Sequence, residues 1–153
     1  MSLDYNFRIA TPLTAGQVVS VARDALALTQ PPHATANQDK DEFQGPGFLL
    51  AAGPIAHASQ AMMEEGLGIV PSVDLQFWVD ADQRHHAVTA LLRGVLAVLQ
   101  RVPGDAVLLF GGESVLLLRR GRHLQLDSRT GIWTPERLAL ADMPYALQDL
   151  PVL

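Results

Sequence analysis

The clearest hydrophobic pattern in the chain runs from Gln83 to Asp127 and predicts one long helix followed by three short strands. From Gln83 to Val102, apolar residues recur at three- and four-residue spacing and so share one buried helical face: Val88, Leu91, Leu92, Val95, Leu99 and Val102. Small residues form a stripe beside them that lets another backbone approach closely: Ala87, Ala90, Gly94 and Ala97. Pro103-Gly104 predicts the end of this helix.

The three strands that follow are predicted to form a meander. The apolar run from Asp105 to Phe110 is typical of a central strand. Gly111-Gly112 predicts a two-residue hairpin, because both residues tolerate positive φ. The chain then returns from Ser114 to Arg119, turns at Arg120-Gly121, and continues in the alternating strand from His123 to Asp127.

The first third of the chain is predicted to hold a strand, a helix and a loop. Residues 3–9 alternate between apolar and polar side chains, which predicts a strand with one face in water. Thr14 and Gln17 form a capping box that opens a helix. From Thr29 to Gly47 there is no periodicity, and charged and small polar residues dominate, so residues 29–47 are predicted to be a flexible loop.

Two strands and a short helix are predicted next. Phe48–Ala52 is typical of a buried strand, and His57–Glu65 of a short helix with Met62 inward and Gly66 as its left-handed cap. The strand from Ser72 to Asp80 has the cleanest alternation, with four apolar residues on one face: Val73, Leu75, Phe77 and Val79.

The order of these elements predicts an α+β fold. Thr134 and Pro135 indicate a last short helix, and the residues from Tyr145 to Leu153 are expected to lie across the body as a packed tail. Hairpins and alternating strands favour a mostly antiparallel sheet with helices packed on one face. We expect a single α+β domain over residues 1–153.

Composition is that of an ordinary globular protein. Of the 153 residues, 48% are hydrophobic and 18% are charged, and no apolar run approaches the roughly 20 residues that span a bilayer. Residues 1–5 lack the basic and apolar start of a signal peptide, so a cytoplasmic protein without membrane contact is the simplest expectation. The absence of cysteine excludes disulfides and thiolate chemistry.

Charge is distributed unevenly along the chain. Residues 1–82 carry a net charge of −7, whereas residues 83–153 carry +2. An acidic first half argues against nucleic-acid binding, which needs a positive field. It would suit a basic protein partner, although an acidic surface that only keeps the protein soluble is an equal reading.

The residues that could carry catalysis form no recognised motif. His85 and His86 are adjacent on a helix, so they point about 100° apart and cannot both bind one metal ion. Asp82 and His86 could supply two ligands, but two are too few for a site. We therefore expect no catalytic residues, no metal and no cofactor. The basic cluster from Arg119 to His123 is better explained by turn-flanking arginines that shield an edge strand than by an anion or RNA site.

One group of residues is typical of a protein interface. Trp78 falls on the polar side of its strand, with Asp74, Gln76 and Asp80. A tryptophan among acidic and amide groups is the composition of an interface anchor, so these four residues are the predicted partner-binding site. The alternative is that a loop or the C-terminal tail covers Trp78.

Several segments together resemble the SitI type of bacterial immunity proteins. These are the opening Leu3–Thr11, the block Pro103–Phe110, and the closing segments Trp133–Leu138 and Leu150–Leu153. Proteins of this type protect kin cells of swarming bacteria from a toxin delivered by sister cells. The resemblance implies a protein that neutralises a cognate toxin by binding, and it offers no catalytic residues.

Two other classes of function stay open from the sequence. A small-molecule-binding or regulatory domain would hold a deep polar pocket between sheet and helices. An enzyme of unrecognised type would use Asp82, His85 or His86, and its structure would show converging His and Asp side chains.

Overall fold

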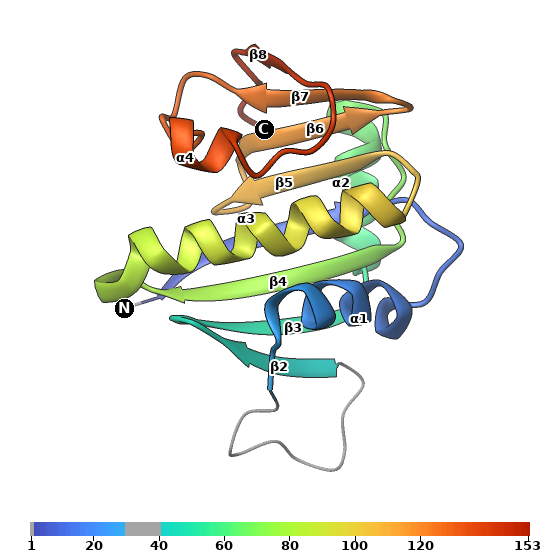
Figure 1. The fold of residues 1–153 in the computed structure, drawn as a ribbon. Helices are drawn as coiled ribbons and strands as arrows, with labels where there is room; N and C mark the ends of the chain where they lie inside the picture. Colours follow the sequence, from blue (N-terminus) through green and yellow to red (C-terminus); the bar gives the residue numbers. More distant parts are fainter. Residues whose placement is uncertain (1, 30–40) are drawn as a thin grey trace.

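The computed structural model describes residues 2–29 and 41–153 and has an α+β fold built on one eight-stranded sheet, which confirms the predicted class (Figure 1). The strands are β1 (Ser2–Ile9), β2 (Asp41–Gly45), β3 (Phe48–Pro54), β4 (Val73–Asp80), β5 (Ala106–Phe110), β6 (Ser114–Arg120), β7 (His123–Asp127) and β8 (Ala146–Gln148). The helices are α1 (Ala15–Leu26), α2 (His57–Leu67), α3 (Arg84–Arg101) and α4 (Pro135–Leu138), with a single helical turn η1 (Ala81–Gln83) before α3. No helix in the described ranges has the length and apolar character needed to cross a bilayer.

The strand order places the first strand in the middle of the sheet. The order is β2-β3-β4-β1-β5-β6-β7-β8, and every neighbouring pair is antiparallel except β7 and β8. Tyr5 of β1 lies between Phe77 of β4 and Phe110 of β5. The predicted meander of β5, β6 and β7 is therefore joined to the rest of the sheet through β1.

Helices α1 and α3 cover one face of the sheet, which we call the inner face. The predicted apolar face of α3 is buried throughout, and Leu91, Leu92 and Val95 are fully inaccessible. The small-residue stripe has the predicted purpose. A Cβ atom at Gly94 would stand 2.8 Å from Leu26 Cδ1, so glycine lets α1 pack closely against α3.

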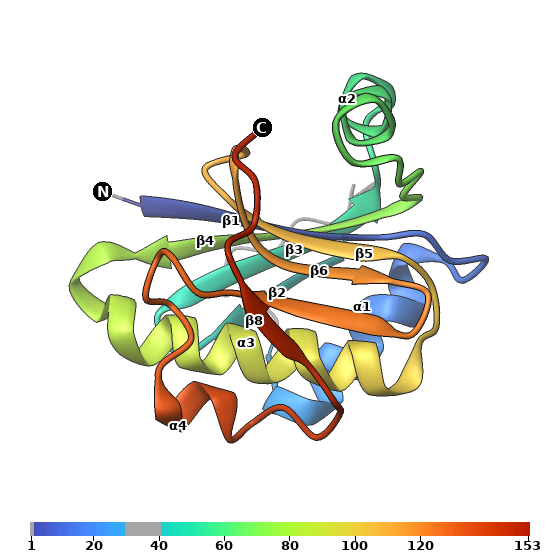
Figure 2. The same cartoon turned by 90° about the horizontal axis from the view of Figure 1, so that it is seen from above.

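Helix α2 lies on the opposite face of the sheet, the outer face, so the prediction of helices on one face only was wrong (Figure 2). Its inward residue is Met63, which is fully buried, whereas the predicted Met62 is 45% exposed. The reason lies in β5 and β6, whose side chains are apolar on both faces. Four of them form a second core with α2, Ile69 and Leu150: Val107, Leu109, Val115 and Leu118.

Two turns differ from their predicted positions. The left-handed cap of α2 is Gly68, with φ of 69°, and not Gly66, because the helix continues to Leu67. The turn between β5 and β6 has three residues, not two, since Phe110 pairs with Ser114. A register shift between Leu108 and Leu109 accompanies this longer turn.

The predicted loop 29–47 contains a strand that periodicity does not reveal. Residues 41–45 form β2, the outermost strand, which pairs with β3, and Thr29 bridges to Gln44. At an edge position the strand needs little apolar alternation, which explains why the sequence lacks that signal. The prediction was therefore wrong for residues 41–45, and residues 30–40 lie outside the described part of the chain.

Arg119, the first residue of the predicted basic cluster, is buried, and its side chain caps the end of helix α3. Its guanidinium donates to the carbonyl oxygens of Leu99, Val102 and Gly104 at 2.6, 2.6 and 2.9 Å. Burial lowers the pKa of Arg119, and nearby Asp105 opposes that shift. The edge-shielding explanation fails for this residue, because β6 is an interior strand.

The C-terminal tail is held by a buried carboxylate. Asp127 is 1% exposed, and its Oδ1 and Oδ2 accept hydrogen bonds from the backbone N–H groups of Leu150 and Thr130 at 3.0 and 2.8 Å. Burial by itself would raise the pKa of Asp127, but these backbone hydrogen bonds outweigh it and the net pKa is lowered. The ionised form therefore stabilises the folded chain.

We expect Asp127→Asn to lower the free energy of unfolding at neutral pH by about 1–3 kcal/mol, because the new amide would turn a donor towards an existing donor. The folded pKa of Asp127 is depressed, so its contribution is present above the unfolded pKa of about 3.9 and is lost as the pH falls further. Urea unfolding from neutral to acidic pH measures this. The difference between wild type and variant should shrink below about pH 4, and a constant difference would contradict the assignment.

Candidate functional site

The four predicted partner-binding residues lie together on the outer face of β4. Asp74, Gln76 and Trp78 are half-buried and Asp80 is exposed, whereas the alternate residues of the strand point into the inner core. Strand alternation thus places these side chains on one face, on the opposite side of the sheet from α3.

Trp78 lies in an open row of side chains that crosses four strands. It pairs with Asp4 on β1 and with Leu49 on β3, and Leu49 pairs with Gln44 on β2. Leu49 is 37% exposed, and Gln44 and Asp4 are exposed. A surface hollow beside Trp78 is lined by residues of β2, β3 and β4 and by Gln83. The C-terminal tail instead packs along β6, where Val115 N–H donates to Pro151 O at 3.2 Å.

Asp80 has a structural role as well as a place on this face. One carboxylate oxygen accepts from the backbone N–H of Asp82 at 3.0 Å, and the other from the side-chain amide of Gln83 at 3.3 Å. It therefore caps η1, the turn that leads into α3. Its substitution would disturb the start of α3 as well as any contact with a partner.

Asp74 belongs to a polar network with Asn6 and Arg8 of β1. These two residues were predicted to face water. Asn6 Nδ2 donates to Asp74 Oδ1 at 3.1 Å, and Arg8 Nε lies 3.6 Å from the same oxygen. Asn6 and Arg8 are only 8% and 7% exposed, and they line a hollow together with Ala56 and Ser59 at the start of α2. Nε and Nη1 of Arg8 have no hydrogen-bond partner in the described chain, so this network holds unused donors.

The uncovered part of the outer face is acidic. Arg8 is its single cation in the described strands β1 to β4. Four carboxylates lie on it: Asp4, Glu42, Asp74 and Asp80. Its aromatic centre is Trp78.

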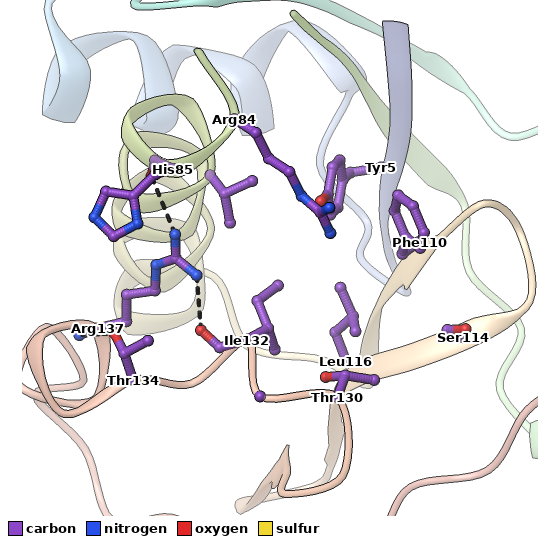
Figure 3. Close-up of a pocket in the computed structure, with 12 residues that line it drawn as sticks. Tyr5, Arg84, His85, Phe110, Ser114, Leu116, Thr130, Ile132, Thr134 and Arg137 are labelled. Carbon is purple, nitrogen blue, oxygen red and sulfur yellow. Dashed lines mark hydrogen bonds between the residues drawn. The ribbon is translucent and has the colours of Figure 1, made fainter. Parts of the chain in front are cut away.

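A second concavity, which no pattern in the sequence predicts, lies at the other side of the sheet, at the start of α3 (Figure 3). We call it the α3 cavity. It has a volume of about 750 Å³ and is lined by Tyr5, Arg84, His85, Val88, Phe110, Ser114, Leu116, Thr130, Gly131, Ile132, Thr134 and Arg137. These residues come from β1, α3, β5, β6, α4 and the segment before α4, so no local motif could have revealed it.

The two histidines that could carry catalysis lie at the start of α3. His85 and His86 are exposed on its first turn, and Asp82 is exposed on η1. Within residues 2–29 and 41–153, no group of three His, Asp or Glu side chains could hold a metal ion. The backbone of His85 takes part in structure, since its carbonyl accepts from Arg137 Nη2 at 3.0 Å.

Comparison with known proteins identifies a family. A family model described as SitI3-like matches residues 3–137. No curated protein and no solved structure matches the chain. The matched stretch holds the four predicted site residues on β4 and all the residues that line the α3 cavity.

Proposed function

Because the chain belongs to the SitI3-like family, we propose that it is an immunity protein that binds and neutralises a cognate bacterial toxin in the cytosol of the producing cell. It acts by occluding the toxin and not by catalysis. The observation that supports this proposal is the uncovered, acidic outer face of β4 with Trp78 at its centre.

The partner that fits this surface is a protein with a basic patch. Asp4 pairs with Trp78 and Asp80 is the next residue of β4 on the same face, so the tryptophan can enter an apolar recess while these carboxylates meet lysine or arginine side chains. Charge complementarity of this kind mainly accelerates association. A toxin that acts on an acidic substrate such as nucleic acid would carry such a patch.

The hollow beside Arg8 offers a second point of contact. Nε and Nη1 of Arg8 make no hydrogen bond within the described chain, although Nε is ion-paired with Asp74, and the hollow of about 350 Å³ is also lined by Gln76 and Ser59. A backbone carbonyl or side-chain amide of the toxin would satisfy these donors without adding a charge next to Asp74. This contact would fix the orientation of the toxin on the sheet.

Co-purification tests the function itself. Where a toxin gene lies next to the gene for this chain, we expect its product, co-expressed with this chain, to elute with it at fixed stoichiometry, and cells that express both to survive. Survival without a complex would contradict neutralisation by binding.

Trp78→Ala tests the surface. The variant should stay folded, because Trp78 is half-buried and lies outside both cores, but it should bind the toxin at least about thirtyfold more weakly, as expected when a central interface tryptophan is truncated at a loss of about 2 kcal/mol. Calorimetry gives the affinity, and a melting curve gives the folded state.

The matched control is Leu147→Ala on β8. Leu147 is 48% exposed and lies at the opposite edge of the sheet from β2, so its truncation should leave toxin affinity unchanged. If folded Trp78→Ala bound the toxin as tightly as the wild type, the outer face of β4 would not be the interface. If Trp78→Ala unfolded, Trp78 would be a core residue.

A further inference from the structure

The α3 cavity combines an apolar floor with a cationic wall. Aromatic and aliphatic side chains of the sheet and of the segment before α4 form the floor: Tyr5, Phe110, Leu116 and Ile132. Arg84 and Arg137 stand at the side of α3, and Figure 3 shows the guanidinium of Arg84 next to the rings of Tyr5 and Phe110. Among the residues that the structure describes, no Asp or Glu lines the cavity.

Arg137 is a buried cation without a counter-ion. It is 7% exposed, and its guanidinium donates to three neutral acceptors, Thr89 Oγ1, Ile132 O and His85 O, at 2.9 to 3.0 Å. No carboxylate in the described chain lies within ion-pair distance of it. Burial lowers the pKa of Arg137, with Tyr5 and Glu136 raising it and Arg84 lowering it further. The protein therefore holds this guanidinium in a fixed position at an electrostatic cost that a bound anion would relieve.

Arg84 places a second cation on the same space. Its guanidinium carbon lies 5.8 Å from the centre of the Phe110 ring, and the residue is exposed, so its donors are free to meet a ligand. It occupies the first turn of α3, where the helix end already carries partial positive charge. Arg84 lies close enough to Arg137 for its positive charge to lower the pKa of Arg137.

From these observations we propose that the α3 cavity binds an organic anion, with its carboxylate, sulfonate or phosphate group held by Arg84 and Arg137 and its aromatic or aliphatic body on Phe110 and Ile132. The volume of about 750 Å³ is that of a small-molecule site. This site is separate from the outer face of β4, so it does not depend on the toxin interface. It gives the alternative reading from the sequence, a small-molecule-binding domain, a definite location.

The probe for this site is anilinonaphthalene sulfonate, whose fluorescence increases when its rings leave water. We expect the purified full chain to bind one equivalent at neutral pH. Arg84→Gln should weaken this binding about tenfold, the loss expected for one charge-assisted contact. Phenylnaphthylamine, the same ring system without the sulfonate, should bind wild type and variant with equal affinity.

Two controls separate binding at this site from nonspecific binding of the dye. Arg93→Gln removes a charge from the exposed face of the same helix, outside the cavity, and should leave sulfonate binding unchanged. Melting curves must show both variants folded, because partly unfolded chains also bind this dye. Arg84 is exposed and has no ion pair in the described chain, so Arg84→Gln is expected to fold.

Competition distinguishes an organic anion from a simple one. Benzene sulfonate should displace the dye, and inorganic phosphate at the same ionic strength should not. Displacement by phosphate alone would show an anion site without an apolar part. Equal loss of both dyes in Arg84→Gln, no loss of either, or binding of many equivalents would overturn the proposal.

Discussion

Leu92→Asp is expected to unfold the protein. Leu92 is fully buried in the inner core, on the face of α3 that packs on the sheet, and an aspartate there would place an unpaired carboxylate among apolar side chains. The expected loss is about 5 kcal/mol or more, which equals the whole stability of many domains of this size. Circular dichroism and urea unfolding at neutral pH measure the effect.

Arg93→Asp is the matched control for this substitution. Arg93 is the next residue along α3 but is exposed, so the same new side chain should change the free energy of unfolding by about 0.5 kcal/mol or less. A Leu92→Asp variant with the melting temperature of the wild type would show that the assigned buried face of α3 is wrong.

Arg119→Met is expected to give the second-largest loss of stability. Methionine fills much of the same volume but leaves the carbonyls of Leu99 and Val102, at the buried end of α3, without donors. We expect the free energy of unfolding to fall by about 3 kcal/mol, which corresponds to a decrease of about 10 °C in melting temperature for a domain of this length. Differential scanning calorimetry measures this.

Arg122→Met separates this effect from a general loss of positive charge. Arg122 lies three residues further along the chain, is exposed in the turn after β6, and should tolerate the same change within about 0.5 kcal/mol. If the two variants melted together at the wild-type temperature, the three hydrogen bonds from Arg119 would contribute nothing to stability.

Periodicity predicted the parts of the fold in which one face of an element is buried. The strand Val73–Asp80 and the helix Arg84–Arg101 have clear alternation or helical spacing, and both were found close to their predicted bounds. Periodicity failed to predict the packing of strands that are covered on both faces, and it failed to predict an edge strand that has little need of a buried face. The side chains of β6 are apolar on both faces, so alternation did not show that a helix covers the outer face. Strand β2 lacked apolar alternation because it lies at the edge of the sheet.

The candidate sites differ in how far a sequence can show them. Trp78, Asp74 and Asp80 share a face because they lie on one strand, so alternation alone groups them. Arg84 and Arg137 meet across the fold, and nothing in the spacing of the sequence brings them together. Arg8 likewise shares a hollow with Ala56 and Ser59 at the start of α2, and no local pattern in the sequence predicts the position of α2.

The central position of β1 has a consequence for how the protein is made. Tyr5 leaves the ribosome early, but its partners Phe77 and Phe110 are far along the chain, so the middle of the sheet cannot close until β5 has been synthesised. Long-range pairing of this kind gives high contact order and slow folding. Newly made chains therefore spend time with an apolar, unpaired first strand. A chaperone that shields nascent β1 should increase the yield of folded protein and leave the stability of the finished fold unchanged.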